Sequence, residues 1–190
     1  MSEQATSGYA WVASIPDEAV VCLDTETTGV SVRADEVLQV ALIGGDGSVL
    51  LNELVKPERH ASWHQAELVH GITPQDVEDA RLLRELIPEI DRILLNAGLV
   101  VGYNLRFDMG FLGRAGVRRP RCPLFDVMRA FAPIAKVRGE DGSFMWRSLE
   151  ECARYFGVAF DPHDALEDAR ATLACFKRMA GIEERKRHGG

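Results

Sequence analysis

The sequence has 190 residues, which suits one domain with an ample buried core. Apolar residues make up 46% and charged residues 27%, the ordinary balance of a soluble globular protein. No stretch approaches the roughly 18 apolar residues of a membrane span, and the N-terminus has no secretory signal pattern. We therefore expect a cytoplasmic protein with no membrane partner.

The net charge of −7 argues at first sight against a nucleic-acid partner, because proteins that cover phosphates are usually basic. If four carboxylates hold two divalent cations, however, the charge becomes about −7 + 4 = −3. The cysteines form no CxxC pair, so we expect reduced, buried thiols rather than a zinc site. They are Cys22, Cys122, Cys152 and Cys175.

The first third of the chain predicts strands. Residues 1–17 form a polar, irregular lead-in, and the folded domain is expected over 18–181. Short apolar, β-branched runs predict three strands, at 19–24, 36–44 and 48–55. Gly45-Asp46-Gly47 between the last two is a good hairpin signal.

Helices and strands alternate in the rest of the chain. A short helix capped by Ser62 and ending at His70-Gly71 is followed by a helical pattern over 81–96, interrupted at Pro88. The later elements are a strand at 98–103, a helix at 105–115, a strand at 121–125, a helix at 126–135, a glycine-containing loop at 136–147, a helix from the Ser148–Glu151 capping box to Tyr155, a helix at 164–180 and a disordered charged tail at 182–190. This order predicts an α/β domain with a mixed sheet flanked by helices.

Two carboxylates follow the first predicted strand. Asp24 and Glu26 are two residues apart, so in a strand their side chains share one face. Adjacent carboxylates repel, and a hard divalent cation with oxygen ligands relieves that repulsion. The alternative is a strand that simply ends in a polar turn at Gly29.

Two more acidic positions stand where helices begin. Asp108 lies in the first turn after the 98–103 strand, where a negative charge is favourable without any ligand. Pro162 predicts that the last helix begins near Asp164, which leaves His163 on the loop, free to approach Asp168. A histidine at such a position is also common as a cap or surface residue.

Together these segments resemble a known family. DTETTG at 24–29, NxxFD at 104–108 and HxAxxD at 163–168 match the motifs of the DEDDh (DnaQ-like) 3′→5′ exonucleases, in the family's order. The resemblance covers roughly residues 19 to 180, and His70-Gly71-Ile72-Thr73 is similar to a segment of the epsilon-like members. It implies a ribonuclease-H-like fold with a five-stranded mixed sheet.

The resemblance also implies a mechanism. Asp24, Glu26, Asp108 and Asp168 would hold two divalent cations, Mg²⁺ or Mn²⁺, for in-line displacement at phosphorus. His163 would be the general base. The reaction would release nucleoside 5′-monophosphates from a nucleic acid with a single-stranded 3′ end.

Substrate contacts are expected from a few small or polar residues. The backbone of Thr27, Thr28 and Gly29 would approach the terminal nucleotide, while Asn104 would fix the Asp108 loop or touch the substrate. Other aromatic and basic residues are less decided. Phe107 is expected in the core beside Phe111, and His70 is expected to be structural. Phe144 and Trp146 would either stack on bases or pack on the next helix. Three arginines would form a solvated loop face or steer phosphates: Arg118, Arg119 and Arg121.

Three alternatives remain open from the sequence. The domain is either a stand-alone trimming or repair exonuclease or a proofreading subunit bound to a polymerase. A catalytically silent binding or scaffold domain is the alternative from another class. The preference for DNA or RNA and the presence of a homodimer partner are not decided by any motif.

Overall fold

The computed structural model describes Tyr9 and residues 11–181. The strands are β1 (Val20–Thr27), β2 (Val37–Gly44), β3 (Val49–Lys56), β4 (Arg81–Leu82), β5 (Leu99–Gly102) and β6 (Leu124–Asp126). The helices are α1 (His64–His70), α2 (Leu83–Asn96), α3 (Leu105–Ala115), α4 (Val127–Ala135), α5 (Leu149–Phe156) and α6 (Ala165–Met179). Two 3₁₀ turns, η2 (Val12–Ser14) and η3 (Asp17–Ala19), precede β1.

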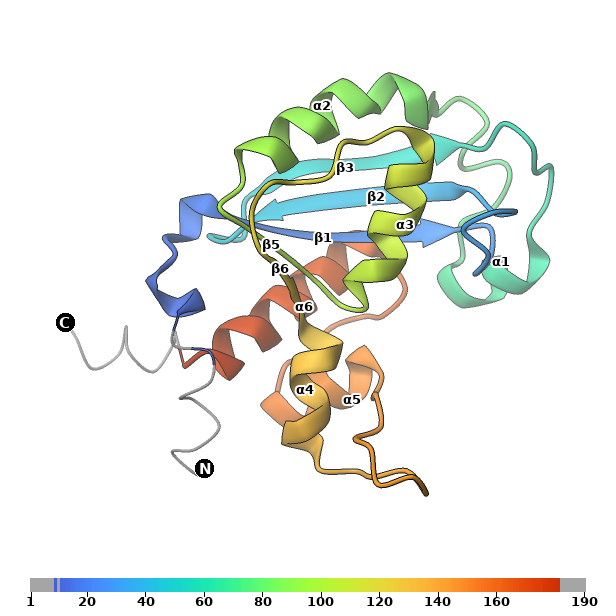
Figure 1. Cartoon of the computed structure of the whole chain (residues 1–190). Coiled ribbons are helices and arrows are strands. Elements are labelled where there is room, and N and C mark those ends of the chain that lie inside the picture. Colours follow the sequence, from blue (N-terminus) through green and yellow to red (C-terminus); the bar gives the residue numbers. More distant parts are fainter. Residues whose placement is uncertain (1–8, 10, 182–190) are drawn as a thin grey trace.

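The strands form one mixed sheet in the order β4-β3-β2-β1-β5-β6 (Figure 1). β1, β2 and β3 are an antiparallel meander, and β5 and β6 extend it in parallel on the other side of β1. This confirms the predicted α/β fold, with six strands instead of five. The additional strand, β4, pairs with β3 where the helical pattern was expected to begin. Two residues show no periodicity, so sequence patterning cannot reveal such a strand.

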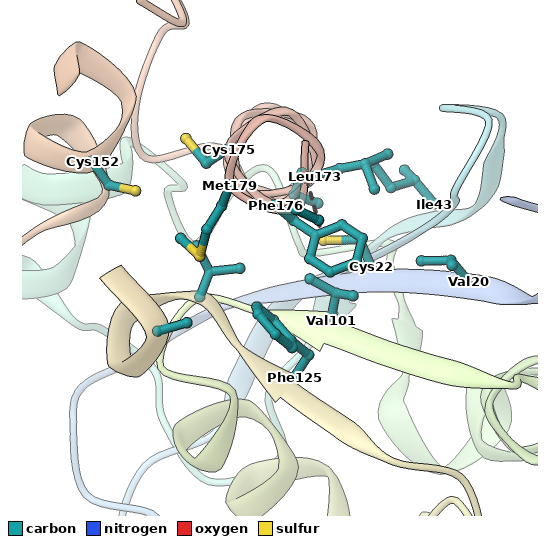
Figure 2. Close-up of a cluster of buried hydrophobic side chains, with 14 of the residues drawn as sticks. Val20, Cys22, Ile43, Val101, Phe125, Cys152, Leu173, Cys175, Phe176 and Met179 are labelled. Carbon is teal, nitrogen blue, oxygen red and sulfur yellow. Dashed lines mark hydrogen bonds between the residues drawn. The ribbon is translucent and has the colours of Figure 1, made fainter. Parts of the chain in front are cut away.

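Alternate residues of the central strands supply two cores, one on each face of the sheet. On one face, Cys22, Ile43 and Val101 pack beneath α6, together with α4 and α5 (Figure 2). On the other face, Leu23 and Leu42 pack against α2 and α3. Because side chains alternate along a strand, each residue of β1 is committed to one of these two faces. All four cysteines are free thiols, as expected, but Cys122 is partly exposed, so the burial expected for it was wrong.

Most predicted boundaries agree with the structure, and two local details were wrong. The hairpin at Gly47 and the Ser148–Glu151 capping box are both present. Ser62 does not cap α1, which begins after Trp63 without a side-chain cap. Pro88 does not interrupt α2, since the helix continues through this exposed position from Leu83 to Asn96.

The described part of the lead-in packs against the domain. Val12 is fully buried in the core beneath α6. Tyr9 donates a hydrogen bond from Oη to the Ala130 carbonyl (3.2 Å) and meets the Phe125 ring edge-on. The boundary expected at residue 18 stays a prediction, and the 182–190 tail lies outside the described residues. Among the residues that the structure describes, no helix is long and apolar enough to cross a membrane.

Candidate active site

The end of β1 presents different chemistry on its two faces. Asp24 and Glu26 follow Cys22 on the face that α6 covers, whereas Thr25 points to the face of α3. The i, i+2 spacing therefore brings the two carboxylates to one side, as the sequence predicted. The neighbouring strand β2 places Gln39 opposite Glu26.

Three carboxylates converge at this strand end. Asp24, Glu26 and Asp168 each offer an oxygen, and these oxygens all lie within 4.8 Å of one another. Burial, reinforced by the charges of Asp108 and Asp168, raises the pKa of Asp24 well above its usual range. Burial and then Asp168 raise the pKa of Glu26 to about 8. Ionising these neighbouring carboxylates is unfavourable unless a counter-ion is present. A hard divalent cation, which prefers oxygen ligands, fits this arrangement.

Asp108 is anchored from the opposite face of β1. Its side chain is 2% exposed, and Thr25 Oγ1 donates a 2.7 Å hydrogen bond to Asp108 Oδ1. Burial raises the pKa of Asp108 to about 7, while the hydrogen bond from Thr25 lowers it. Asp108 lies outside the group of three oxygens, yet after burial its charge contributes most to the raised pKa of Asp24. Thr25 was not singled out from the sequence, because its partner is 83 positions away.

The start of α6 holds the histidine and the last carboxylate. His163 has a positive φ of 72°, and its backbone N–H donates to Asp168 Oδ1 (3.2 Å). The imidazole points elsewhere, with Nε2 3.8 Å from Glu150 Oε1 and 41% of the side chain exposed. Burial raises the pKa of Asp168 to about 6. The sequence missed Glu150, because a first-turn acid after the Ser148 cap carries no sign of a partner on α6.

Gln39 fixes the same helix start and was also missed. It is 5% exposed on β2, its Nε2 donates to Asp164 Oδ2 (3.0 Å), and its Oε1 accepts from Ala165 N (3.1 Å). Asp164 in turn caps α6 by accepting from Leu166 N. One amide side chain thus ties the sheet to the helix that carries Asp168.

The loop after β1 uses its own side chains internally. Thr27 Oγ1 donates to the Gly29 carbonyl (2.7 Å), and Thr28 Oγ1 accepts from Glu36 N (3.0 Å). A Cβ on Gly29 would lie 2.6 Å from an Asp35 carboxylate oxygen, so a larger residue at position 29 would have to displace the Asp35 side chain. With both hydroxyls engaged, a substrate contact from this segment would come from the backbone, and that contact stays a prediction.

Asn104 and His70 support the site through the backbone. Asn104 adopts a left-handed conformation (φ 56°), which asparagine tolerates, and its N–H donates to Asp126 Oδ1 (3.2 Å). His70 Nδ1 accepts from Ile72 N (3.0 Å), so its Nε2 carries the proton and donates to the Thr27 carbonyl (3.3 Å). His70 is therefore structural, as expected, and lies against the loop that follows β1.

The remaining candidates separate in the structure. Phe107 packs on Phe111 with ring centroids 4.9 Å apart, which confirms its core role. Phe144 lies against the guanidinium of Arg138 (4.2 Å) and Trp146 against that of Arg129 (5.8 Å). Base stacking by these two rings stays a prediction.

Comparison with known proteins gives a family. The model of the RNase_T exonuclease family matches residues 21–176, from β1 through most of α6. The chain belongs to this exonuclease family. The exonuclease CP81 of Escherichia phage 186, described as uncharacterized, is 30% identical, over 84% of this chain and 87% of the phage protein. The PolC-type DNA polymerase III of Thermotoga petrophila is 28% identical, over 98% of this chain but only 14% of the polymerase.

Solved structures share the exonuclease fold. Exonuclease I of E. coli in complex with a dT13 oligonucleotide superposes with a TM-score of 0.69 at 22% identity. The match covers 90% of this chain and 42% of that enzyme. A likeness at this identity establishes the fold, while the chemistry must be argued from the side chains.

Proposed function

We propose that the chain is a metal-dependent 3′→5′ exonuclease that releases nucleoside 5′-monophosphates from single-stranded 3′ ends of DNA or RNA. The observation that carries the proposal is the convergence of the half-buried Asp24, Glu26 and Asp168, whose carboxylate oxygens lie within 4.8 Å of one another. Carboxylates with a structural role are normally paired with positively charged side chains. These carboxylates instead lie next to one another, and their pKa values are raised.

The residues suit divalent-cation binding. Asp24, Glu26 and Asp168 would hold one Mg²⁺ or Mn²⁺, and Asp108 would help to hold a second. The cations would supply Lewis-acid stabilisation of the charge that develops on the phosphate, and would favour ionisation of the attacking water.

The chain's own groups would move the proton. We assign His163 as the general base: its exposed imidazole, which in this structure lies 3.8 Å from Glu150, would turn toward the carboxylates and accept the proton of the attacking water. Water adds to the phosphorus of the terminal nucleotide, the P–O3′ bond breaks, and the leaving 3′-oxygen takes a proton from solvent, to which the imidazolium returns its own. The penultimate nucleotide keeps a 3′-hydroxyl and the terminal one leaves as a 5′-monophosphate.

The test is a length assay. Single-stranded DNA and RNA oligomers labelled at the 5′ end are incubated with Mn²⁺ or with EDTA, and the products are resolved by length. We expect a ladder that shortens from the 3′ end, with metal only, and none with Asp24→Asn. The polymer degraded faster identifies the substrate class. A full-length oligomer in every lane, or equal shortening by Asp24→Asn, refutes the proposal.

A proofreading role is the second candidate, because the chain resembles a segment of PolC-type polymerases. In that role the domain should remove a mismatched 3′ terminus faster than a paired one and bind a replicative polymerase. Equal rates on both termini, with no polymerase retained by the immobilised protein, leave the stand-alone role. The silent-domain alternative predicts no thermal stabilisation by Mn²⁺.

A further inference from the structure

A groove runs beside the free edge of β6. It lies between α3 and the first turns of α4 and has a volume of about 870 Å³. Figure 1 shows both helices close to this end of the sheet. Its apolar lining includes Met109, Leu124 and Phe125, and two glycines of α3, Gly110 and Gly113, also line it. A Cβ on Gly113 would meet no atom within 4 Å, so the groove is open at that point.

Arginines line this groove, and two of them are unpaired. Arg106 and Arg119 are exposed and make no hydrogen bond or ion pair with any residue that the structure describes. Arg118 differs from its neighbour, because its Nε donates to Asp91 Oδ2 at 2.8 Å. Two free guanidinium groups over an apolar lining, in a chain of net charge −7, favour an anionic ligand with flat apolar parts.

The groove shares helix α3 with Asp108 of the carboxylate site. Arg106 stands two residues before Asp108 on α3, at the end of the groove nearest the site. Asp126 lies between the two regions: it accepts from Asn104 N, and its charge contributes to the raised pKa of Asp108. Its negative charge is countered by Arg129, 3.7 Å away. Asp126, which lines the groove, therefore lies beside Asp108 of the carboxylate site.

We propose that this groove holds the nucleotides upstream of the 3′ end as the single strand leaves the carboxylate site. Arg106 and Arg119 contact phosphates near the two ends of this stretch, and the bases lie on the apolar lining. The 11 residues of α3 span about 16 Å, which is room for roughly four stacked nucleotides. The inference rests on the proposed function, since it names the binding track of the same substrate.

The experiment compares a 20-mer with a dinucleotide as substrates, in Mn²⁺, for four variants. Arg119→Ala removes the distant phosphate contact, Arg106→Ala the near one, and Gly113→Leu fills the groove with a side chain that the helix accommodates. Arg114→Ala is the matched control, since this exposed arginine lies on the same helix but lines a separate hollow beside α2.

For Arg119→Ala and Gly113→Leu we expect the KM for the 20-mer to rise about three- to tenfold while the KM for the dinucleotide changes less than about twofold. Arg106→Ala and Arg119→Ala should each also lower the salt dependence of 20-mer binding by about one phosphate contact. Arg114→Ala should match the wild type. If the three groove variants behave like Arg114→Ala, the groove proposal is overturned while the exonuclease proposal stands.

A binding measurement separates the two proposals. Fluorescence anisotropy of a labelled 20-mer in EDTA measures binding to the protein in the absence of the reaction. Suppose that the wild type degrades nothing but binds the 20-mer, and that Arg119→Ala binds it more weakly. This result refutes the exonuclease proposal and supports the groove proposal. If the wild type does not bind the 20-mer, the groove proposal is overturned directly. That outcome is also the one expected if a protein segment, rather than a nucleic acid, occupies the β6 edge.

Discussion

Helices α3 and α6 each bring one carboxylate to the end of β1, and each follows a residue with positive φ. At α3, Asn104 leads to Asp108, which is 2% exposed and receives a hydrogen bond from Thr25. At α6, His163 leads to Asp168, which is partly exposed and, among the residues that the structure describes, receives a hydrogen bond only from the His163 backbone. The structure thus has one carboxylate locked in place and one at the open rim.

The difference has a physical use. A locked ligand keeps the geometry of a site, whereas a ligand at the rim can adjust as substrate enters and leaves. The rim also carries the imidazole, the group that we assign to proton movement, and Glu150 beside it. Variants that act on one helix and spare the other test whether this division is real.

The largest effect is expected from neutralising the carboxylates. Asp108→Asn and Asp168→Asn should each lower kcat about a thousandfold or more, because each weakens cation binding. They should differ in stability, since Asn at 108 removes a fully buried charge. Metal-free Asp108→Asn should therefore melt above the wild type at pH 8.5, by more than Asp168→Asn. Equal melting temperatures for both variants would contradict the contrast between the two helices.

Thr25→Val tests the locked side alone. It deletes the hydrogen bond that lowers the pKa of Asp108, so that pKa should rise further above about 7. We expect about tenfold less activity at pH 7, partly regained at pH 9, in a pH–rate profile with saturating Mn²⁺. Thr172→Val is the matched control, because this buried hydroxyl of α6 has no partner among the described residues. Loss of activity that is independent of pH would argue against the role given to Thr25.

Gln39→Leu tests the attachment of the rim helix. It leaves Ala165 N without its acceptor, which should cost about 1–3 kcal/mol in urea unfolding. Activity should fall about three- to tenfold, with a higher Mn²⁺ requirement, because Asp168 is held less firmly. Asn52→Ala is the control, since it removes the other partner of Gln39 and leaves the contact with α6. An unchanged Mn²⁺ requirement would mean that Gln39 only stabilises the fold.

The smallest effect concerns pH and stability. Glu26 has a pKa of about 8 in the folded chain and 4.5 as its ordinary value. Between these values the folded state keeps a proton that the unfolded state has lost, so stability falls as pH rises. In EDTA the melting temperature should drop by roughly 5 °C from pH 5 to pH 8.5. Excess Mn²⁺ should remove most of that slope, and Glu26→Gln should reduce it.

The sequence singled out the five proposed catalytic residues because each lies in a short local motif, and the three motifs together resemble those of the DEDDh exonucleases. The pair Asp24 and Glu26 needs only the two-residue strand repeat, and Asp108 and Asp168 need only a helix start. The groups that position them were not predictable in the same way. Thr25 and Gln39 find their partners 83 and 126 positions away, and only the assembled sheet brings them together.

The same distinction explains the errors in the fold. The long periodic segments were correct, including α6 and the β2–β3 hairpin. The missed β4 depends on a neighbour, Val55 of β3, rather than on any pattern of its own. Ser62 is a residue type that commonly caps helices, but α1 begins one residue later than this cap would place it, at His64 after Trp63.

Burial of Val12 sets a practical limit on how the domain can be cut. The family match begins at residue 21 and ends at 176, yet Val12, Met179 and Ala180 belong to the same core. The unit that folds cooperatively is therefore longer at both ends than the unit that defines the family. A fragment trimmed to the family boundaries would expose apolar surface and leave a void under α6. We expect such a fragment to aggregate during expression.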